Sequence, residues 1–266
     1  MLFRSGSEKL NWSVDFNSIS LAELPNHWNF DIGDGSQHGL TGWGNNELEF
    51  YTQDAVKIGE NLEIRANKTN LEDNFECYYG KALWTSGKIH TANKISIKYG
   101  RIDVVAKMPT GVGTWPAIWL LGCDLLKGNA WPHCGEIDIL ETTGANPNQI
   151  QGTIHGPGYF GEAGLTKIIQ AEKPLSEAFH TYSINWMEDK IEWLFDGEIY
   201  NSISKSDVEN FGFSWPFNQA FYLILNLAIG GWFAGEVDPR LENATLEIKS
   251  IKHYKIDGVG EVSINA

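Results

Sequence analysis

Short runs with the alternating pattern of β-strands recur along the chain at intervals of about 8–12 residues, and helical periodicity is almost absent. The clearest runs are residues 88–98, 101–107, 180–186, 190–195, 221–229 and 245–255. After the run 190–195, the pair Asp196-Gly197 is typical of a tight hairpin turn. The best helical candidate, residues 175–179, is only a single turn long. The pattern therefore predicts an all-β protein.

The length and the spacing of turn residues bear on the number of domains. A chain of 266 residues accommodates two modest domains or one large β domain, at about 150 residues per domain. The run 221–229 (FYLILNLAI) is nearly all apolar, which is typical of a strand buried on both faces. The sequence contains no internal repeat, low-complexity stretch or long linker. We therefore predict one antiparallel two-sheet domain over residues 1–266.

The charge balance argues against several classes of partner. The 34 acidic residues outnumber the 20 Lys and Arg residues, which gives a net charge of −14. Such a surface repels phosphate backbones and anionic lipids, so we expect no nucleic-acid or membrane partner. The opening residues 1–7 (MLFRSGS) are too short and polar for a signal peptide. We therefore expect either a secreted, extracellular protein whose signal has been removed or a cytoplasmic one, and in either case a monomer.

The three cysteines do not indicate a metal or redox site. Cys77, Cys123 and Cys134 form no Cys-x-x-Cys pattern, which argues against a zinc site or a thioredoxin-like motif. Cys123 and Cys134 are close enough in sequence to form a disulfide in a secreted protein, and free thiols are the default expectation.

Residues 135–141 (GEIDILE) form the most informative segment for chemistry. Glu136 and Asp138 alternate with isoleucines, so both carboxylates project from one face of a strand. Glu141 lies at an odd offset from Glu136, which in a regular strand would send it to the opposite face. A β-bulge near Ile139-Leu140 adds one residue and returns Glu141 to the side of the other acids.

Three acids on one strand face suggest a reaction rather than a structural role. With the bulge, the Cα atoms of Glu136 and Glu141 lie about 13 Å apart, at ~3.3 Å per residue. On a concave strand, their carboxyl groups approach to roughly 5 Å, the separation found in retaining glycosidases. Asp138 between them can hold a shared proton, because neighbouring like charges raise one pKa. The alternative is an acidic strand that faces solvent, which also suits the net charge of −14.

The segment EIDILE (residues 136–141) resembles the active-site strand of glycoside hydrolase family 16, in its laminarinase branch. Other matches follow along most of the chain: GWGNNEL (42–48), YGR (99–101), GTWPAIWLLG (113–122), GTIHGPGY (152–159), FHTY (179–182) and LNLAIGG (225–231). This ordered series is specific, although no single element would be. The bulged spacing resembles laminarinases more than lichenases, whose corresponding strand lacks the extra residue.

The resemblance implies a β-jelly roll of two curved antiparallel sheets with a concave substrate cleft. It implies endo-acting hydrolysis of β-1,3-glucosidic bonds with retention of configuration, and leaves mixed β-1,3/1,4-glucans open as substrates. Glu136 then corresponds to the nucleophile, Glu141 to the acid/base and Asp138 to the residue that tunes them. No metal or cofactor takes part in this chemistry.

Several aromatic residues suit a sugar cleft. The chain contains 11 tryptophans, and Trp is favoured where a flat ligand face is stacked. Trp115 and Trp119 lie four residues apart, hence on one strand face, and with Trp131 they offer apolar planes to pyranose rings. Trp232, after Gly230-Gly231, is a further candidate. The alternative for each of them is packing in the core.

Three polar residues are added to the predicted cleft. His155 alternates with Thr153 and is expected beside the acid pair, although a lone His is usually an ordinary polar residue. By resemblance, Asn45 and Arg101 bind sugar hydroxyls. Each of these two could instead form a surface salt bridge or cap a turn.

The sequence departs from the family at a calcium position. Many members hold a structural calcium on the convex side, partly through an aspartate in the last strand. Here the strand reads LEIKSI (246–251), and Lys249 takes the place of the aspartate. An ammonium group cannot bind Ca²⁺, so we expect no calcium there.

Two other functions remain compatible with the sequence. One is a glucan-binding lectin on the same scaffold that does not hydrolyse, although such relatives typically lose the carboxylates that this chain retains. The other is a family-16 enzyme of different specificity, such as a lichenase, agarase, carrageenase or transglycosylase. Sulfated galactans would favour basic cleft residues, and the chain has few basic residues for its length.

Overall fold

Residues 7–70 and 72–265 are described by a computed structural model, and within them β-strands dominate. The opening stretch that was considered as a signal peptide lies, apart from Ser7, outside the described residues. No helix in the described part is long and apolar enough to cross a bilayer. The predicted all-β class is confirmed, and the two large sheets form the expected jelly roll.

The first large sheet, here called the outer sheet, has ten strands among the described residues. Its order is β18 (Glu198–Ser204), β17 (Lys190–Phe195), β16 (His180–Trp186), β11 (Gly100–Lys107), β20 (Asn243–Ile256), β5 (Leu62–Lys68), β8 (Trp84–Ser86) and β3 (Glu49–Tyr51), with β1 (Glu8–Asp15) on β20 and β4 (Val56–Ile58) on β5. All its pairings are antiparallel except that of β3 with β8.

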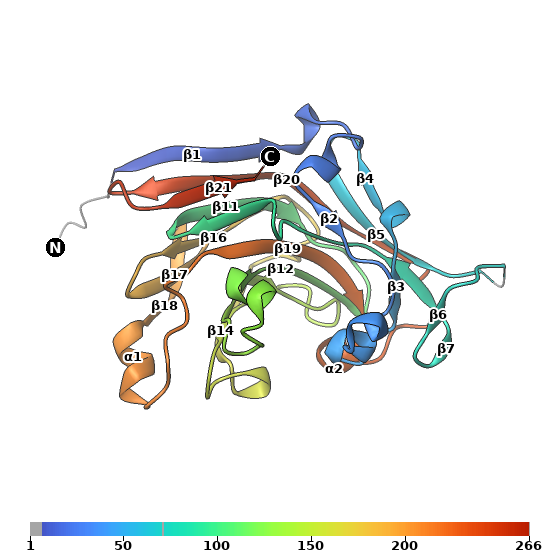
Figure 1. The fold of residues 1–266 in the computed structure, drawn as a ribbon. Helices are drawn as coiled ribbons and strands as arrows, with labels where there is room; N and C mark the ends of the chain where they lie inside the picture. Colours follow the sequence, from blue (N-terminus) through green and yellow to red (C-terminus); the bar gives the residue numbers. More distant parts are fainter. Residues whose placement is uncertain (1–6, 71, 266) are drawn as a thin grey trace.

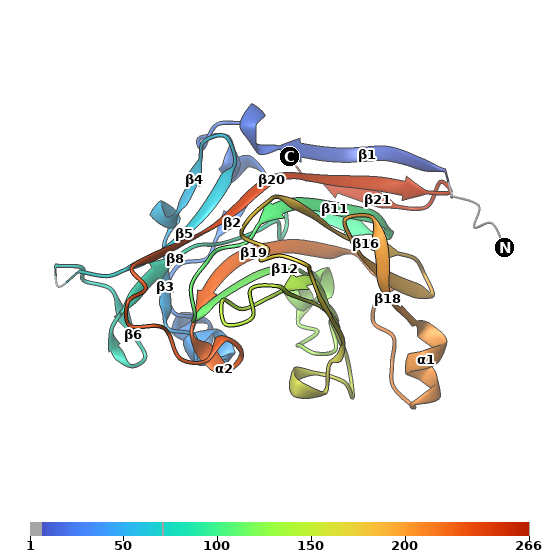
Figure 2. The ribbon, with the colours of Figure 1, turned by 180° about the vertical axis from the view of Figure 1, so that it is seen from behind.

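The second large sheet, here called the inner sheet, has nine strands in the same described ranges. Its order is β15 (Leu165–Gln170), β14 (Gln149–His155), β13 (Glu136–Glu141), β12 (Thr114–Gly122), β19 (Phe221–Ile229), β10 (Ile95–Lys98) and β21 (Glu261–Ile264), with β9 (Lys88–His90) on β19 and β2 (Asn29–Phe30) on β9. Figure 1 shows the strands arching together, with β1 and β20 on the outside and β12 and β19 beneath them. Figure 2 shows the same arch from behind.

The remaining elements are short. A two-stranded hairpin joins β6 (Glu76–Cys77) to β7 (Gly80–Lys81), and the α-helices are α1 (Lys205–Asn210) and α2 (Gly231–Ala234). Single 3₁₀ turns are η1 (Phe16–Ser18), η2 (Leu24–Asn26), η3 (Ser36–His38), η4 (Thr41–Gly44), η5 (Gln53–Ala55), η6 (Cys123–Lys127) and η7 (Gly161–Ala163).

The hydrophobic core lies between the two sheets. On β11, Ile102 and Val104 are fully buried, and on β12 Ile118 and Leu120 face them from the inner sheet. The alternate residues of β12 therefore point to the opposite, concave face of the inner sheet. Burying each such side chain contributes about 1.5–3 kcal/mol, so the alternation of apolar residues sets which face carries the site.

Most strand predictions are confirmed. The runs 180–186, 190–195 and 221–229 coincide with β16, β17 and β19, and every residue of β19 is buried as expected. The run 88–98 is divided into β9 and β10, because residues 91–94 form a turn in which Asn93 has a φ of 63°. The Asp196-Gly197 hairpin connects β17 to β18, and both turn residues have positive φ.

The helical candidate at residues 175–179 is wrong, because this stretch forms a turn without helix. The α1 helix forms instead where Ser204 and Asp207 make a reciprocal capping box, a signal that the sequence analysis did not use. The three cysteines are free thiols, which confirms the default expectation and not the disulfide.

Candidate active site

The bulge predicted on strand β13 is present and reverses the direction of Glu141. On neighbouring β12, Trp119 pairs with Asp138 and Ala117 pairs with Glu141. The two paired positions are three residues apart on β13 and only two residues apart on β12, so β13 contains one extra residue. The pairing with β14 is shifted at the same place. Because Trp119 and Ala117 alternate on β12, their partners Asp138 and Glu141 lie on one face.

The bulge is supported from the outer sheet. Its disrupted ladder needs another donor for a backbone carbonyl, and Trp193 Nε1 of β17 donates to the carbonyl oxygen of Asp138 at 2.8 Å. Trp193 reaches this carbonyl because β14 carries Gly152 at the crossing. A Cβ atom on Gly152 would lie 2.5 Å from the Trp193 ring, so a larger residue would displace it.

The acids at the two ends of β13 each accept a hydrogen bond from a tryptophan. Trp131 Nε1 donates to Glu136 Oε2 at 2.8 Å, and Trp115 Nε1 donates to Glu141 Oε1 at 3.0 Å. Trp131 is 41% exposed, so one of its faces is open to a ligand. The structure thus places Trp115 and Trp131, two of the four predicted tryptophans, in direct contact with the predicted acids.

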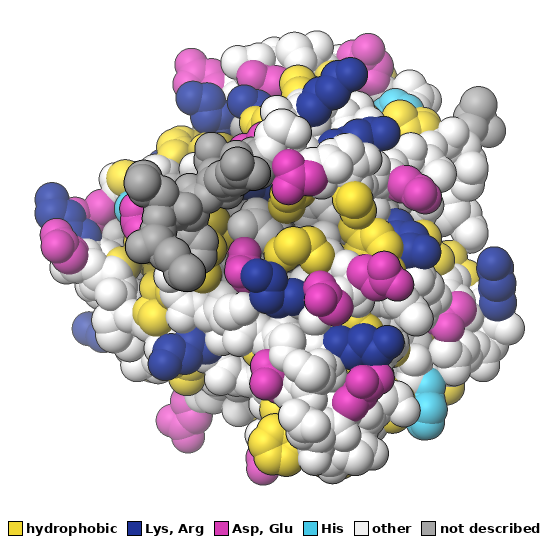
Figure 3. Space-filling model, turned by 90° about the vertical axis from the view of Figure 1, so that its left-hand side faces the viewer, with side chains coloured by type: hydrophobic (Ala, Val, Ile, Leu, Met, Phe, Trp, Pro, Cys, Tyr) yellow, Lys and Arg dark blue, Asp and Glu magenta, His cyan; other side chains and the backbone are white. Residues whose placement is uncertain are grey.

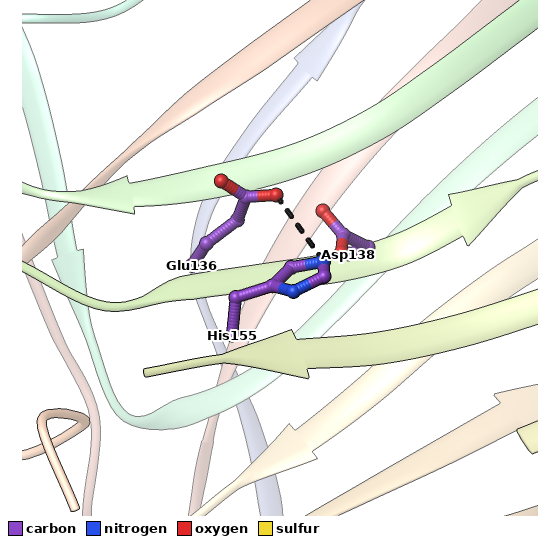
Figure 4. Close-up of side chains that lie close together, drawn as sticks. All are labelled: Glu136, Asp138 and His155. Carbon is purple, nitrogen blue, oxygen red and sulfur yellow. Dashed lines mark ion pairs between the residues drawn. The ribbon is translucent and has the colours of Figure 1, made fainter. Parts of the chain in front are cut away.

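His155 projects from β14 toward two acids of β13, Glu136 and Asp138. Its Nε2 lies 3.2 Å from Asp138 Oδ2 and 3.6 Å from Glu136 Oε1. Figure 4 shows Glu136 and Asp138 side by side with the imidazole beside them. The Glu136 side chain is 16% exposed and that of Asp138 only 4%, so Glu136 is the acid that a ligand reaches.

Burial raises the pKa of all three carboxyl groups, and the negative charge of a neighbouring acid adds to each rise. For Glu136, burial has the largest effect on the pKa, followed by the negative charge of Asp138, while His155 opposes the rise. Burial and the charge of Glu141 raise the pKa of Asp138. Burial also raises the pKa of Glu141, and His155 and then the donor Trp115 partly offset this rise. The cluster therefore retains a proton under conditions where an exposed acid loses it.

The same cluster has the atoms of a cation site. One ligand atom each from Glu136, Asp138 and His155 lies within 4.8 Å of the others. Two carboxylates and an imidazole are ordinary ligands for a divalent ion. The prediction that no metal takes part rests on the family resemblance and stays a prediction.

The floor of the concave face continues from β12 to β19 and β9, where sequence reasoning missed several residues. Trp119 Nε1 donates to Asn226 Oδ1 at 2.8 Å, which places this predicted tryptophan on the floor. Lys88 Nζ lies 5.5 Å from the centre of the Trp119 ring and 3.3 Å from Asp31. The signal was available: Lys88 precedes the buried Ile89 on β9, so it must face the side opposite the core.

Asn45 and Trp232 lie together at the end of the site near Trp115. The backbone N–H of Trp232 donates to the carbonyl oxygen of Asn45 at 2.9 Å. Asn45 Nδ2 donates to Glu47 Oε1 at 2.9 Å, and the charge of Glu47 raises the pKa of Glu141. Trp232 is 73% exposed and free to contact a ligand.

The structure contradicts the prediction that Arg101 is a cleft residue. Arg101 lies on β11 of the outer sheet, and its neighbours Gly100 and Ile102 are the residues that face the core. Its guanidinium pairs with Asp103 at 2.6 Å and with Glu8 at 3.4 Å. The alternative, a surface salt bridge, is confirmed, because strand alternation directs this side chain away from the inner sheet.

A curved β-sandwich with a row of carboxylates on its concave strand, flanked by tryptophans, has the features of a glycoside hydrolase. The chain belongs to the family described as glycosyl hydrolases family 16, whose model matches residues 43–251. This confirms the family identified from the sequence motifs.

Individual relatives agree with this assignment. The chain is 35% identical to a beta-glucanase of Rhodothermus marinus, over 93% of this chain and 85% of the relative. The laminarinase catalytic domain of Thermotoga maritima MSB8 superposes with a TM-score of 0.87 at 40% identity, covering 93% of this chain and 98% of that one. An endo-β-1,3-glucanase of Pyrococcus furiosus gives a TM-score of 0.87 at 36% identity, with 94% and 95% covered.

Proposed function

We propose that this glycoside hydrolase cleaves internal β-1,3-glucosidic bonds of laminarin-type glucans with retention of configuration. Glu136 is the nucleophile, Glu141 the acid/base and Asp138 the residue that controls their protonation. The observation that carries the proposal is the bulge in β13, which puts Asp138 and Glu141 on the concave face of one strand. The activities named for the similar proteins support the same substrate class.

In the first step, Glu136 attacks the anomeric carbon while Glu141 donates its proton to the departing glycosidic oxygen. The nucleophile must be ionised, and Trp131 and His155 favour its ionised form through a donated hydrogen bond and a nearby imidazole. The Asp138 side chain is only 4% exposed, and burial together with the charge of Glu141 raises its pKa well above the usual range. A proton held on Asp138 leaves Glu136 free to attack.

In the second step, Glu141 acts as a base toward water, which attacks the covalent glycosyl intermediate from the same side as the leaving group. Glu141 suits both roles because burial raises its pKa, while the Trp115 N–H stabilises the carboxylate after the proton leaves. Two displacements at one carbon restore the original configuration. The product is therefore the β-anomer.

The tryptophans supply binding to the sugar rings. Trp131 and Trp232 are 41% and 73% exposed, more than an ordinary core tryptophan. Trp115 and Trp119 are partly buried on the floor, with their indole N–H groups directed to polar partners. Apolar ring faces bounded by polar donors match the flat face and equatorial hydroxyls of a glucosyl unit.

We propose that no calcium binds on the convex side at the position of Lys249. Lys249 lies on β20 where the pairing with β11 shifts by one residue, and its side chain is exposed. An ammonium group at this point offers no oxygen ligand and repels a cation.

We further propose that residues 1–266 form one catalytic domain that acts as a monomer on extracellular glucan. One core cluster contains residues from both sheets, which supports a single folding unit. A polymeric glucan does not cross membranes, which favours action outside the cell. On the face shown in Figure 3, basic and acidic side chains are interspersed, which offers no uniform surface to a nucleic acid.

The proposal is tested by incubating the protein with laminarin, lichenan and agarose and analysing the products. We expect oligosaccharides from laminarin, less from lichenan and none from agarose. Proton NMR of the first products should show new β-anomeric reducing ends before mutarotation. Release of α-anomers, or cleavage of agarose alone, would contradict the proposal.

The alternative of a non-hydrolytic lectin on this scaffold is disfavoured by the site itself. A binding protein has no use for three mutually repelling carboxylates whose burial raises their pKa. Calorimetry that detects laminarin binding, together with chromatography that detects no products, would support the lectin instead.

A further inference from the structure

A second pair of carboxyl groups, Glu47 and Glu49, lies beside the floor of the site, and neither of them attacks the sugar or transfers a proton to it in the reaction above. Glu49 is fully buried at the start of β3, and Glu47, which forms a bridge with Gly230, is 5% exposed. Two adjacent buried acids are costly unless donors and a shared proton compensate them. Their partners therefore show what the pair does.

The hydrogen bonds assign a different protonation state to each acid. Both oxygens of Glu47 accept: Oε1 from Asn45 Nδ2 at 2.9 Å and Oε2 from Tyr51 Oη at 3.2 Å. Glu49 Oε2 accepts the backbone N–H of Ile229 at 2.8 Å, while its buried Oε1 has no hydrogen-bond partner among the described residues. A buried oxygen beside a carboxylate is stable when it carries a proton. Burial, with the charge of Glu47, also raises the pKa of Glu49 well above its usual range.

A continuous chain of hydrogen bonds connects Glu47 to Trp119. The Trp119 indole can only donate, so Asn226 Oδ1 is its acceptor, at 2.8 Å. The amide group of Asn226 then directs Nδ2 to Tyr51 Oη at 3.1 Å. Tyr51 in turn donates to Glu47. Every bond in the chain has one possible direction, provided that Glu47 is an acceptor.

Trp119 is next to the reacting acids. It pairs with Asp138 across β12 and β13, and its ring lies on the concave face. Tyr51 is fully buried and Asn226 is 6% exposed, so the chain behind Trp119 is closed to solvent. Tyr51 itself is too deeply buried to touch a polysaccharide.

We propose that Glu47 is a positioning residue, which acts through Tyr51 and Asn226 to hold the Trp119 ring ready for a glucosyl unit. Glu49 is the protonated, neutral member of the pair, so the two adjacent buried acids carry only one negative charge. The inference rests on the proposed function, because it assigns Trp119 as a sugar-binding surface. A preformed ring face lowers the entropy lost on binding, so its loss weakens binding rather than chemistry.

The first experiment compares two buried tyrosines in a Glu136→Gln background, which binds oligosaccharide without turning it over. Tyr51→Phe removes the hydroxyl group that connects Asn226 to Glu47 and so interrupts the chain of hydrogen bonds. Tyr182→Phe removes a hydroxyl that is equally buried and lacks a hydrogen-bond partner in the described structure. By calorimetry with a laminari-oligosaccharide, we expect Tyr51→Phe to raise Kd about three- to tenfold and Tyr182→Phe to change it less than twofold. Equal Kd values for the two variants would overturn the inference.

The second experiment separates the two acids. A neutral Gln at position 49 keeps a side-chain oxygen that can accept the Ile229 N–H and places no negative charge beside Glu47. A Gln at position 47 must lose or reverse one of its two accepted bonds. We expect Glu47→Gln to raise Kd about three- to tenfold and Glu49→Gln to raise it less than twofold. The opposite order would overturn the assignment.

A double-mutant cycle tests the path to the ligand. In a Trp119→Phe background the indole N–H is missing, so Tyr51→Phe should add less than a twofold further change in Kd. Additive effects would contradict a path through Trp119. In parallel, the enzyme with Glu136 intact is assayed for laminarin cleavage, which tests the proposed function separately. If the variants change Kd as expected but the enzyme does not cleave laminarin, the proposed function is refuted and the positioning role of Glu47 stands. If the protein does not bind the oligosaccharide at all, both proposals are refuted.

Discussion

Two clusters of buried acids lie close together in this protein, and the same physical effects act on both. In the first, Glu136, Asp138 and Glu141 project from the bulged strand β13. In the second, Glu49 begins β3 and Glu47 lies two residues before it. Burial is the largest cause of the raised pKa of Glu136 and of Glu49, and a neighbouring acid adds to it in each case.

The clusters differ in access and in their remaining partners. Glu136 is 16% exposed, beside a tryptophan whose ring is open to a ligand, whereas Glu49 is fully closed off. Both oxygens of Glu47 are already occupied by protein donors. A raised carboxyl pKa therefore does not identify a reactive acid by itself; an approach path for the substrate is also needed.

The largest expected difference between the clusters is in catalysis. Glu141→Gln should lower kcat on laminarin about 10²- to 10⁴-fold, because the proton donor is lost. Glu136→Gln should lower it at least as much, because no covalent intermediate forms. Glu49→Gln should leave kcat within about threefold. Reducing-sugar assays on the three variants check this, and full activity in either of the first two would remove the assignment.

The next effect concerns the pH dependence of the reactive cluster. His155 lowers the pKa of Glu136 and of Glu141, so replacing it with Asn should raise both. Since the nucleophile must be ionised, the acidic limb of the kcat/KM profile should move to higher pH. We expect the loss of activity at pH 5 to exceed that at pH 7 by about three- to tenfold.

Gln substitution of His180, which lies on β16 of the outer sheet and pairs with the exposed Asp196, serves as the control for this profile. Its profile should coincide with that of the unmodified protein. If the acidic limb of the kcat/KM profile does not move in His155→Asn, the imidazole does not stabilise the ionised forms of Glu136 and Glu141.

A smaller effect is expected on stability, and it should distinguish the closed acid pair from ordinary surface acids. The raised pKa of Glu49 means that, above the unfolded value near 4.5, the folded state binds more protons than the unfolded state. Stability therefore falls as pH increases through this interval. Glu49→Gln removes this dependence and should raise Tm at pH 8 by about 2–4 °C, roughly 1 kcal/mol for a chain of this size.

At pH 4 the same substitution should change Tm little, because Glu49 is then largely protonated in both states. Differential scanning calorimetry at the two pH values gives the comparison. Glu60→Gln, in an exposed turn, is the matched control. A Tm gain at pH 4 equal to that at pH 8 would show that the carboxyl charge is not its cause.

The smallest effect expected is that of a chelator. Because Lys249 occupies the convex-side position, EDTA should change Tm by less than about 1 °C. A clear fall in Tm on chelation, restored by Ca²⁺, would contradict the proposal that this position holds no calcium.

The strand pattern predicted much of this architecture because burial imposes period two on the chain. β16, β17 and β19 were located in full, and the bulge followed from the odd spacing of Glu141. The acids, Trp115, Trp131 and His155 were found because their contacts are near β13 or on its neighbours in the inner sheet.

The remaining parts depend on contacts between segments far apart in sequence. Arg101 was misplaced because a resemblance in local sequence does not show which sheet carries a strand. The hydrogen-bond chain from Glu47 through Tyr51 to Asn226 joins β3 to β19, and the last two residues are separated by 175 positions in the sequence. The support of the bulge by Trp193 also crosses from one sheet to the other. Single-sequence patterns contain no signal for such pairings.

The central claim, that Glu136 on the bulged strand is the nucleophile, is tested most directly by trapping the covalent intermediate. In a laminaribiosyl fluoride with a second fluorine at C2, the C2 fluorine slows both displacements. The anomeric fluoride is a good leaving group that speeds only the first displacement, so the glycosyl-enzyme should accumulate. We predict that intact-mass measurement shows one added disaccharide and that peptide mapping places it on Glu136. A label on Asp138 or Glu141, or turnover to the α-anomer without any adduct, would contradict the claim.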